Sequence, residues 1–386
     1  MARNDPATCP AVLYPAPEAP RFSDSVRRWQ GVPSIAVSGR GRIFVNFYAG
    51  QMPETGGNFM LLLSSDDGGI SFIPRLAVEH PDSACRIFDP ALWTDPRGRL
   101  WVFWAQARGF NDGRAGVWCS VCARPDDATP VWGAPRRIAN GIMLNKPIVD
   151  SAGRWLLPCA LWRDGCGAPP TEDHGLDSQK FSNVVCSEDE GEHFYLLGSA
   201  DVPNRGFDEH MLVERGDGSL WMLVRCLDGI GESFSSDGGR HWSTGRKSAI
   251  EGPCSRFFIG RLQSGRLLMV NHHGFGERLG VEEIMAQGDV KCWKGRTHLT
   301  ALLSEDDGLT WPYALLLDVR NDAAYPDAAQ APDGSICICY DWERVRHRQI
   351  LMARITEADI LAGQMVSPES ALRLVVSQAL GKPDVE

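Results

Sequence analysis

The sequence lacks any apolar run long enough to cross a membrane, and residues 1–20 lack the apolar stretch of a secretion signal. It also lacks an excess of positive charge: 39 Lys and Arg residues stand against 49 Asp and Glu residues, a net charge of −10. Such a surface does not attract the phosphate backbone of nucleic acids. We therefore expect a soluble cytoplasmic protein whose partners include neither a membrane nor a nucleic acid. A local arginine cluster is still able to bind a small anionic substrate.

Paired cysteines at the spacing of a zinc site are also missing. Of the 12 cysteines, Cys119 and Cys122 form a C-x-x-C, but no second pair stands at a suitable spacing. Without a secretion signal, cysteines scattered among predicted strands are expected to stay reduced and to pack in the core. The composition therefore predicts neither a metal centre nor a cofactor.

A turn motif, Ser-x-Asp-x-Gly-x-x-Trp/Phe, occurs four times in the chain. The aspartate of such a turn accepts hydrogen bonds from backbone N–H groups, and the glycine takes backbone angles that other residues avoid. The terminal aromatic residue is expected to pack between neighbouring sheets. These features predict a structural role, without chemistry, for the copies at 65–72, 187–194, 235–242 and 304–311.

A second repeat, a glycine-containing turn between two apolar segments, occurs six times. This pattern is typical of β-hairpins. Six hairpins, each followed by a third strand, predict six sheets arranged as the blades of a propeller, in which radial repetition protects the sheet edges. The turns contain Gly41, Gly98, Gly153, Gly218, Gly265 and Gly334.

The predicted fold class is therefore all-β, a single domain that forms a six-bladed β-propeller with a short C-terminal helix. We expect residues 1–26 to form a closing segment, 27–355 the blades and 356–386 a helical tail. The sixth unit ends after its third strand, so residues 11–16 are predicted to supply its outer strand. In the tail, the serine and proline at 367–368 resemble the start of a helix that packs outside the propeller.

Polar residues gather at the starts of the predicted inner strands, which point toward the propeller axis. Such residues are costly to bury without partners, so their convergence on one channel favours a ligand site. The candidates at these strand starts are Pro33, Asp89, Asn145, Lys146, Asp208, Glu209, His210, Arg256, Tyr325 and Asp327. Nearby positions add Arg225, His272, His273 and Arg296.

The aspartate turns and three further segments resemble the sialidase superfamily. EHMLVERGDGSLWMLVR places Glu209 at the start of the fourth blade and Arg225 across its hairpin. GRTHLTALL places Arg296 before the strand that leads to the last aspartate turn, and AAYPDAAQ places Tyr325 at the start of the sixth blade. The resemblance implies that Tyr325 is the nucleophile and Glu209 its base. It also implies that Arg225 and Arg296 clamp the carboxylate of the substrate.

The chemistry of these residue types fits such a site. A tyrosine with a pKa near 10 is a poor nucleophile until a base takes its proton. A neutral tyrosine also avoids repulsion when the substrate carries a carboxylate at the anomeric carbon. Arginine binds a carboxylate through two parallel hydrogen bonds. The predicted partner is therefore an oligosaccharide that ends in an acidic sugar, such as a sialic acid or a related nonulosonic acid.

The sequence departs from the superfamily pattern at two places. Sialidases open their first blade with Arg-Ile-Pro, whereas here Gly31 stands in the place of the arginine. The loop after the first hairpin, where the superfamily keeps an acid/base aspartate, contains no aspartate. Glu54 lies at about the right position in this loop, and a glutamic acid is also able to protonate a leaving group. Glu54 is therefore the candidate acid/base.

Three readings of the function remain open from the sequence. The first is an exo-acting glycoside hydrolase of sialidase type. The second is a β-propeller lyase acting beside a uronic acid, for which a tyrosine or a histidine would move the proton. The candidate histidines are His210, His272 and His273. The same three histidines are the candidates for a metal site, although their spacing does not support one. The third is a non-catalytic glycan-binding propeller, against which the Tyr325–Glu209 pair argues.

Overall fold

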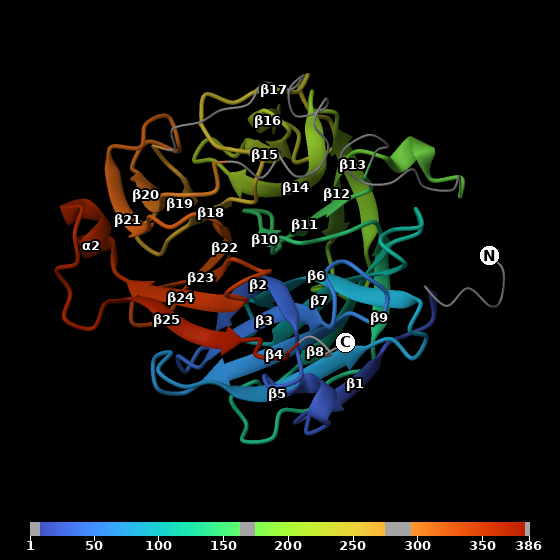
Figure 1. The fold of residues 1–386 in the computed structure, drawn as a ribbon. Helices are drawn as coiled ribbons and strands as arrows, with labels where there is room; N and C mark the ends of the chain where they lie inside the picture. The colour runs from blue at the N-terminus through green and yellow to red at the C-terminus, as the bar shows by residue number, and fades with distance from the viewer. Residues whose placement is uncertain (1–7, 163–173, 275–294, 383–386) are drawn as a thin grey trace.

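Residues 8–162, 174–274 and 295–382 are described in this computed structural model, and they fold into six antiparallel sheets. The sheets follow one another in chain order around a centre, and the last sheet lies beside the first (Figure 1). The prediction of an all-β, six-bladed propeller is confirmed. We number the blades one to six in chain order.

Each blade runs from an inner strand at the axis to an outer strand at the rim (Figure 1). The inner strands are β2 (Trp29–Val37), β6 (Cys85–Thr94), β10 (Ile148–Val149), β14 (Arg205–Glu214), β18 (Phe258–Arg261) and β22 (Ala323–Gln330). The second strands are β3 (Ile43–Gly50), β7 (Leu100–Arg108), β11 (Trp155–Ala160), β15 (Leu220–Cys226), β19 (Leu267–His272) and β23 (Ile336–Trp342). The third strands are β4 (Phe59–Ser65), β8 (Gly116–Cys122), β12 (Ser182–Ser187), β16 (Gly229–Ser235), β20 (Leu299–Ser304) and β24 (Gln349–Ile355). The outer strands are β5 (Ile73–Glu79), β9 (Arg136–Asn140), β13 (Tyr195–Ala200), β17 (Arg246–Lys247), β21 (Tyr313–Asp318) and β25 (Ala371–Gln378).

The hairpin turns between inner and second strands lie where the glycine repeat predicts them. All six turn glycines have φ between 78° and 89°, in the left-handed region that only glycine enters without strain. The core lies between neighbouring blades. For example, Trp101 of β7 and Trp155 of β11 pack edge to face with their ring centroids 5.3 Å apart. All of the described cysteines except Cys9 are buried.

The four aspartate turns connect third strands to outer strands and have the predicted structural role. In the third copy, Asp237 Oδ1 accepts hydrogen bonds from Ser235 Oγ at 2.9 Å and from the N–H of His241 at 3.0 Å. The N–H of Gly239 donates to Ser235 Oγ at 2.9 Å. The other copies repeat these bonds. As predicted, their aromatic residues pack between blades: Phe72, Phe194, Trp242 and Trp311.

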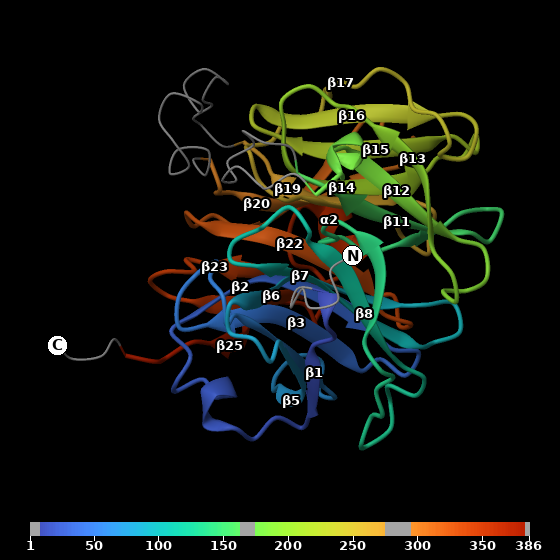
Figure 2. The same ribbon diagram turned by 90° about the vertical axis from the view of Figure 1, so that its right-hand side faces the viewer.

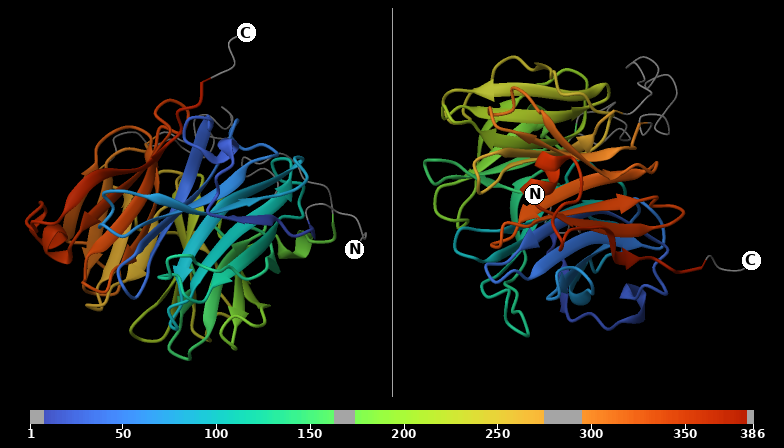
Figure 3. Two further views of the ribbon diagram at one scale, coloured as in Figure 1. Left: turned by 90° about the horizontal axis from the view of Figure 1, so that it is seen from below. Right: turned by 90° about the vertical axis from the view of Figure 1, so that its left-hand side faces the viewer.

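The C-terminal tail differs from the prediction. Residues 371–378 form a strand, β25, which pairs with β24 and completes blade six. The short helix of this tail is α2 (Glu357–Ala362), at the outer rim (Figures 1 and 3). It is capped by Thr356 and Asp359, whereas Ser367, the predicted N-cap, donates its N–H to Asp359 Oδ1 at 2.8 Å. No helix in the described ranges is long and apolar enough to cross a membrane.

The N-terminal closing strand was also predicted in the wrong blade. β1 (Val12–Pro15) pairs with β5 and adds a fifth strand to blade one (Figure 2). The open edge of β24 is taken by β25, which follows it in the chain after α2. The ring is therefore closed by the contact between the two terminal blades rather than by a strand of residues 11–16 in blade six.

An ionic network fills the axis between the blades. The centre of this network is Asp327 of β22, whose side chain is fully buried. Its Oδ2 accepts hydrogen bonds from Lys146 Nζ at 2.8 Å, from Ser34 Oγ at 2.5 Å and from the N–H of Ile35 at 2.9 Å. Arg256 lies 3.7 Å from Asp327 Oδ1. Blades one, five and six and the segment before β10 therefore meet at one carboxylate.

Arg256 and Asn145 extend the network to blade four. Arg256 donates to the carbonyl of Pro33 at 2.7 Å and to Asn145 Oδ1 at 2.8 Å. Asn145 Nδ2 donates to the carbonyls of Glu209 at 2.8 Å and His210 at 3.0 Å. Every one of these contacts joins residues far apart in the sequence, so the network sets how the inner strands lie relative to one another.

We expect the Asp327→Ala variant to lower the free energy of unfolding by about 3–5 kcal/mol, because it leaves Lys146 and Arg256 as buried charges without their carboxylate. Equilibrium unfolding in urea measures this change. The Glu18→Ala variant, which removes an exposed carboxylate, should stay within about 0.5 kcal/mol of the unmodified protein. A loss below about 1 kcal/mol for Asp327→Ala would contradict the role of the network.

Candidate active site

Four inner strands carry a backbone irregularity at matching positions near their starts. The ladder register shifts after Gly31 in β2, after Phe88 in β6, around Asp208 in β14 and after Ala324 in β22. At each shift a non-glycine residue has positive φ: Val32 at 55°, Asp89 at 45°, Glu209 at 41° and Tyr325 at 57°. Bulges of this kind re-aim side chains, and non-glycine residues with positive φ cluster at functional sites.

The bulges of blades four and six bring Glu209 and Tyr325 together, as the sequence predicts. Tyr325 Oη donates to Glu209 Oε1 at 3.0 Å. Arg225 Nη1 lies 2.6 Å from the same Oε1 and donates to Tyr325 Oη at 2.8 Å. All three side chains are buried. The second carboxylate oxygen of Glu209, Oε2, has no hydrogen-bond partner among the described residues.

The phenol of Tyr325 is neutral at physiological pH. Burial raises the pKa of Tyr325 to about 12, although the positive charge of Arg225 acts in the opposite direction. The phenol therefore needs a base before it is able to act as a nucleophile. Glu209, at hydrogen-bond distance, is placed to be that base.

Arg296 lies on another side of the same phenol ring. Its guanidinium carbon is 5.2 Å from the centre of the Tyr325 ring, and its Nη2 donates to the carbonyl of Cys254 at 3.0 Å. Cys254 Sγ also lies 3.4 Å from Arg225 Nε and Nη2. Both predicted clamp arginines thus meet at the Cys254 segment, beside Tyr325.

A third arginine at this ring, Arg344, was missed from the sequence. It lies in the turn between β23 and β24, and its guanidinium carbon is 4.0 Å from the centre of the Tyr325 ring. The signals that point to it are the arginine-rich turn DWERVRHR directly after the sixth hairpin and the absence of an arginine at position 31. Neither signal alone places this side chain at the axis.

The structure brings Glu54 to the bulge region, at the first and second blades. Tyr48 Oη donates to Glu54 Oε1 at 2.5 Å, and Arg86 forms an ion pair with Glu54 Oε2. Both carboxylate oxygens of Glu54 are thus engaged. Asp89 is the second carboxyl group in this region. Its pKa is raised to about 7, mainly by burial and secondly by the negative charge of Glu54.

Aromatic rings form one wall beside this group. Trp162 packs against Phe207 with ring centroids 5.0 Å apart and against Phe110 at 6.0 Å. Arg225 lies with its guanidinium carbon 5.0 Å from the Phe207 ring. These residues lower the local polarity, which strengthens the charge interactions of the buried groups.

Four of the predicted substrate-binding residues lie in the axial network. Asn145, Lys146, Arg256 and Asp327 bond one another and the backbone of neighbouring blades rather than the side chains of Tyr325 or Glu209. Asp208 forms a buried ion pair with Arg205 at 3.0 Å. The structure thus gives these charges and amides partners within the protein.

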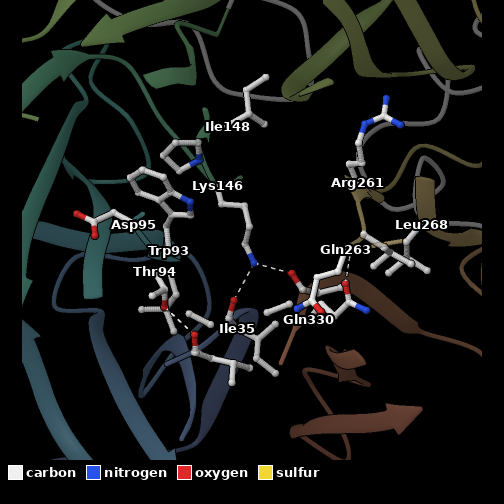
Figure 4. A pocket seen from close by; sticks show the side chains of 18 of the residues that line it. Ile35, Trp93, Thr94, Asp95, Lys146, Ile148, Arg261, Gln263, Leu268 and Gln330 are labelled. Carbon is white, nitrogen blue, oxygen red and sulfur yellow. Dashed lines mark hydrogen bonds between the residues drawn. The ribbon is translucent and has the colours of Figure 1, made fainter. Parts of the chain in front are cut away.

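A cavity of about 670 Å³ opens at the hairpin-turn end of the axis, beyond this network (Figure 4). Its lining includes the turn residues Gly39 and Gly98, and Lys146 points across it to bond the carbonyl of Ile35 at 2.7 Å. The predicted nucleophile and base do not line this cavity. The axis therefore has two ends of different character, separated by the network around Asp327.

The two buried candidate histidines bond groups other than Tyr325 and Glu209. His210 Nε2 lies 2.7 Å from the carbonyl of Asn183, and burial lowers its pKa to about 4. His272 lies 3.0 Å from the carbonyl of Thr297, and burial lowers its pKa to about 3. His273 is exposed. Within the described ranges, no three His, Cys, Asp or Glu side chains form a group that could hold a metal ion.

The family model for a BNR repeat-like domain matches residues 77–338. The fold is similar to that of the Hadza microbial sialidase Hz136, with a TM-score of 0.63 and 16% identity. That match covers 85% of this chain and 66% of the sialidase. This chain therefore spans slightly less than two thirds of the length of the sialidase. No curated protein matches the sequence.

Two further solved structures are similar. The intramolecular trans-sialidase of Ruminococcus gnavus, in complex with oseltamivir carboxylate, has a TM-score of 0.63 and 13% identity, over 93% of this chain and 99% of the other. The leech intramolecular trans-sialidase, in complex with 2,7-anhydro-Neu5Ac, has a TM-score of 0.64 and 12% identity, over 90% and 71%. At these identities the likeness shows the fold alone.

The raised pKa of Asp89 predicts a stability that depends on pH. Its pKa in the folded protein, about 7, lies above the ordinary value of 3.8, so the folded state holds the proton more tightly. The stabilisation is present below pH 4 and is lost as the pH rises through 7. We expect the stability of Asp89→Asn relative to the unmodified protein to increase from pH 5 to pH 8, by on the order of 2 kcal/mol.

Urea unfolding at both pH values measures this gain. The exposed Asp177→Asn variant serves as the control and should follow the unmodified protein at both values. If the free energy of unfolding of Asp89→Asn equalled that of the unmodified protein at both pH values, the pKa of Asp89 would not be raised in the folded state.

Proposed function

The chain belongs to the BNR repeat-like domain family, and from its buried Tyr325–Glu209 pair we propose that it is an exo-acting glycoside hydrolase of sialidase type. Its proposed substrate is an oligosaccharide that ends in an acidic sugar, a sialic acid or a related nonulosonic acid. The observation that carries this proposal is the hydrogen bond of 3.0 Å between Tyr325 and Glu209, with Arg225 bonded to both.

In the first step, Glu209 takes the phenolic proton while Tyr325 Oη forms a bond to the anomeric carbon. The bond from this carbon to the leaving oxygen breaks, and an acid gives its proton to that oxygen. Arg225 Nη1, at 2.8 Å from Oη, stabilises the negative charge that develops on the phenol as the proton leaves. In the second step, the conjugate base of that acid takes a proton from water while the water oxygen bonds to the anomeric carbon, Tyr325 leaves as phenolate, and Glu209 returns the proton to it.

The carboxylate of the substrate is the group that Arg225 and Arg296 would bind. Both guanidinium groups lie beside the Tyr325 ring, so a carboxylate on the anomeric carbon would come between them as the nucleophile attacks. A charged carboxylate nucleophile would be repelled by such a substrate, whereas the neutral phenol is not. One property of the proposed substrate, the carboxylate on its anomeric carbon, therefore explains both the tyrosine and the arginines.

Two carboxyl groups compete for the role of the acid. Glu54, the candidate from the loop position, already accepts hydrogen bonds from Tyr48 and Arg86. Asp89, with a pKa of about 7, keeps a proton near neutral pH and is the better donor to a leaving oxygen. We assign Asp89 as the acid, whose proton is held mainly by burial and secondly by the negative charge of Glu54.

The other two readings have less support. A lyase that moved the proton of a uronic acid with His210 or His272 is not favoured, because both side chains are buried and bonded within their own surroundings. A non-catalytic binding protein has no use for a buried base on a tyrosine. The hydrolase is therefore the function that the side chains support best.

We expect Tyr325→Phe and Glu209→Gln each to lower kcat/KM by at least about 100-fold, because the first removes the nucleophilic oxygen and the second removes the base. The assay is mass spectrometry of acidic oligosaccharides with sialyl, deaminated nonulosonic and uronate-linked ends. The control Tyr195→Phe changes an exposed tyrosine and should keep full activity.

The masses of the products separate the three readings. A released sugar that has gained one water identifies a hydrolase, whereas an unsaturated uronate identifies a lyase. Turnover by Tyr325→Phe at close to the unmodified rate would rule out the proposed nucleophile. No cleavage of any member by the unmodified protein would leave glycan binding as the better account.

A further inference from the structure

Arg344 is held against the candidate nucleophile by a buried carboxylate. Its Nε donates to Asp341 Oδ2 at 2.6 Å, and Asp341 is buried. This contact uses Nε, and the guanidinium carbon lies 4.0 Å from the Tyr325 ring centre. Nη2 is buried and has no hydrogen-bond partner among the described residues. A buried donor in this state is unfavourable, and a bound anion would supply the missing acceptor.

Gly31 of blade one makes room for this side chain. A Cβ atom at position 31 would lie 2.7 Å from Arg344 Cδ and 2.8 Å from its Nε, closer than such atoms approach in proteins. Gly31 does not have a positive φ, so the glycine is needed here for space rather than for backbone angles. Any larger residue at position 31 would displace Arg344 from the Tyr325 ring.

The same carboxylate ties the two blades together at this point. Asp341 Oδ2 also accepts the N–H of Val32 at 2.9 Å, directly after Gly31. Blade six thus supplies the arginine and its counter-ion, while the bulge of blade one supplies the space and a donor. Position 31 and position 344 therefore form one local arrangement, although they are far apart in the sequence.

We propose that Arg344 binds the carboxylate of the acidic sugar and takes the place of the arginine that blade one lacks at Gly31. This inference rests on the proposed function. Its terminal nitrogens would donate to the carboxylate, with Arg225 and Arg296 on the other sides of the Tyr325 ring. A fork fixed at Nε by Asp341 is pre-organised, so little side-chain entropy is lost on binding.

The experiment moves the arginine from one blade to the other. The variants are Arg344→Ala, Gly31→Arg and the double variant with both changes, and the control is Arg346→Ala, which removes an exposed arginine of the same turn. The probe is the 2,3-unsaturated derivative of N-acetylneuraminic acid, compared with its methyl ester, which has no negative charge. Calorimetry gives Kd for both compounds, and circular dichroism checks that each variant is folded.

We expect Arg344→Ala to weaken binding of the acid by about 10- to 100-fold and to change binding of the ester by less than about threefold. Gly31→Arg alone should weaken binding too, since the two arginine side chains collide. The double variant should bind the acid more tightly than either single variant, because the collision is gone and a guanidinium is restored. Arg346→Ala should bind like the unmodified protein.

The outcomes distinguish this inference from the proposed function. If the unmodified protein binds the acid in preference to the ester but Arg344→Ala does so equally well, Arg344 is not a carboxylate ligand and the proposed function stands. A further variant, Arg344→Lys, keeps the charge and loses the two parallel donors. The same conclusion follows if Arg344→Lys and Arg344→Ala are both folded and both bind the acid with the Kd of the unmodified protein. If the unmodified protein neither binds the acid nor cleaves any acidic sugar, the proposed function fails and this inference fails with it.

Discussion

The buried carboxylate of Asp327 is the constraint on which the arrangement of the blades depends. It holds Lys146 and the backbone of blade one directly and stands 3.7 Å from Arg256, which continues to Pro33 and Asn145. These contacts lie beside the bulges of blades one, four and six. A buried ionic group is weak evidence for stability, yet it fixes geometry because each partner is costly to leave alone. Asp327 follows Tyr325 by two residues in β22, so the same strand carries the network and the candidate nucleophile.

The chemistry of the site follows from the strained backbone and the burial of the side chains beside this network. Glu209 and Tyr325 sit at positive φ in bulges that aim both side chains at one point. Burial keeps the phenol neutral, and Arg225 offsets the charge that forms when Glu209 takes the proton. Burial, and after it the charge of Glu54, favours the proton on Asp89. Each group is thus prepared for its proposed role before a substrate binds, which is how buried sites reach reactivity at neutral pH.

The repeats were sufficient to predict the fold, because each copy combines turn chemistry with strand periodicity. The pairing of Glu209 with Tyr325 was implied by the resemblance of their segments to the sialidase superfamily. Arg344 could not be found in this way, because its place at the axis depends on a turn crossing to Gly31, a contact that no local pattern encodes. The strand at 371–378 was predicted as a helix, since a short apolar segment suits either state and pairing with β24 decides between them. The roles of Asn145 and Lys146 likewise depended on distant partners.

The central claim is that Tyr325 attacks the anomeric carbon of an acidic sugar. A sialic acid derivative with fluorine at C2 and C3 tests it most directly, because the fluorine at C3 slows release of a covalent intermediate and the fluorine at C2 is the leaving group. Intact-protein mass spectrometry should show one added glycosyl group, and peptide mapping should place it on Tyr325. An adduct on Glu54 or Asp89, or turnover of substrate without any adduct under these conditions, would contradict the account.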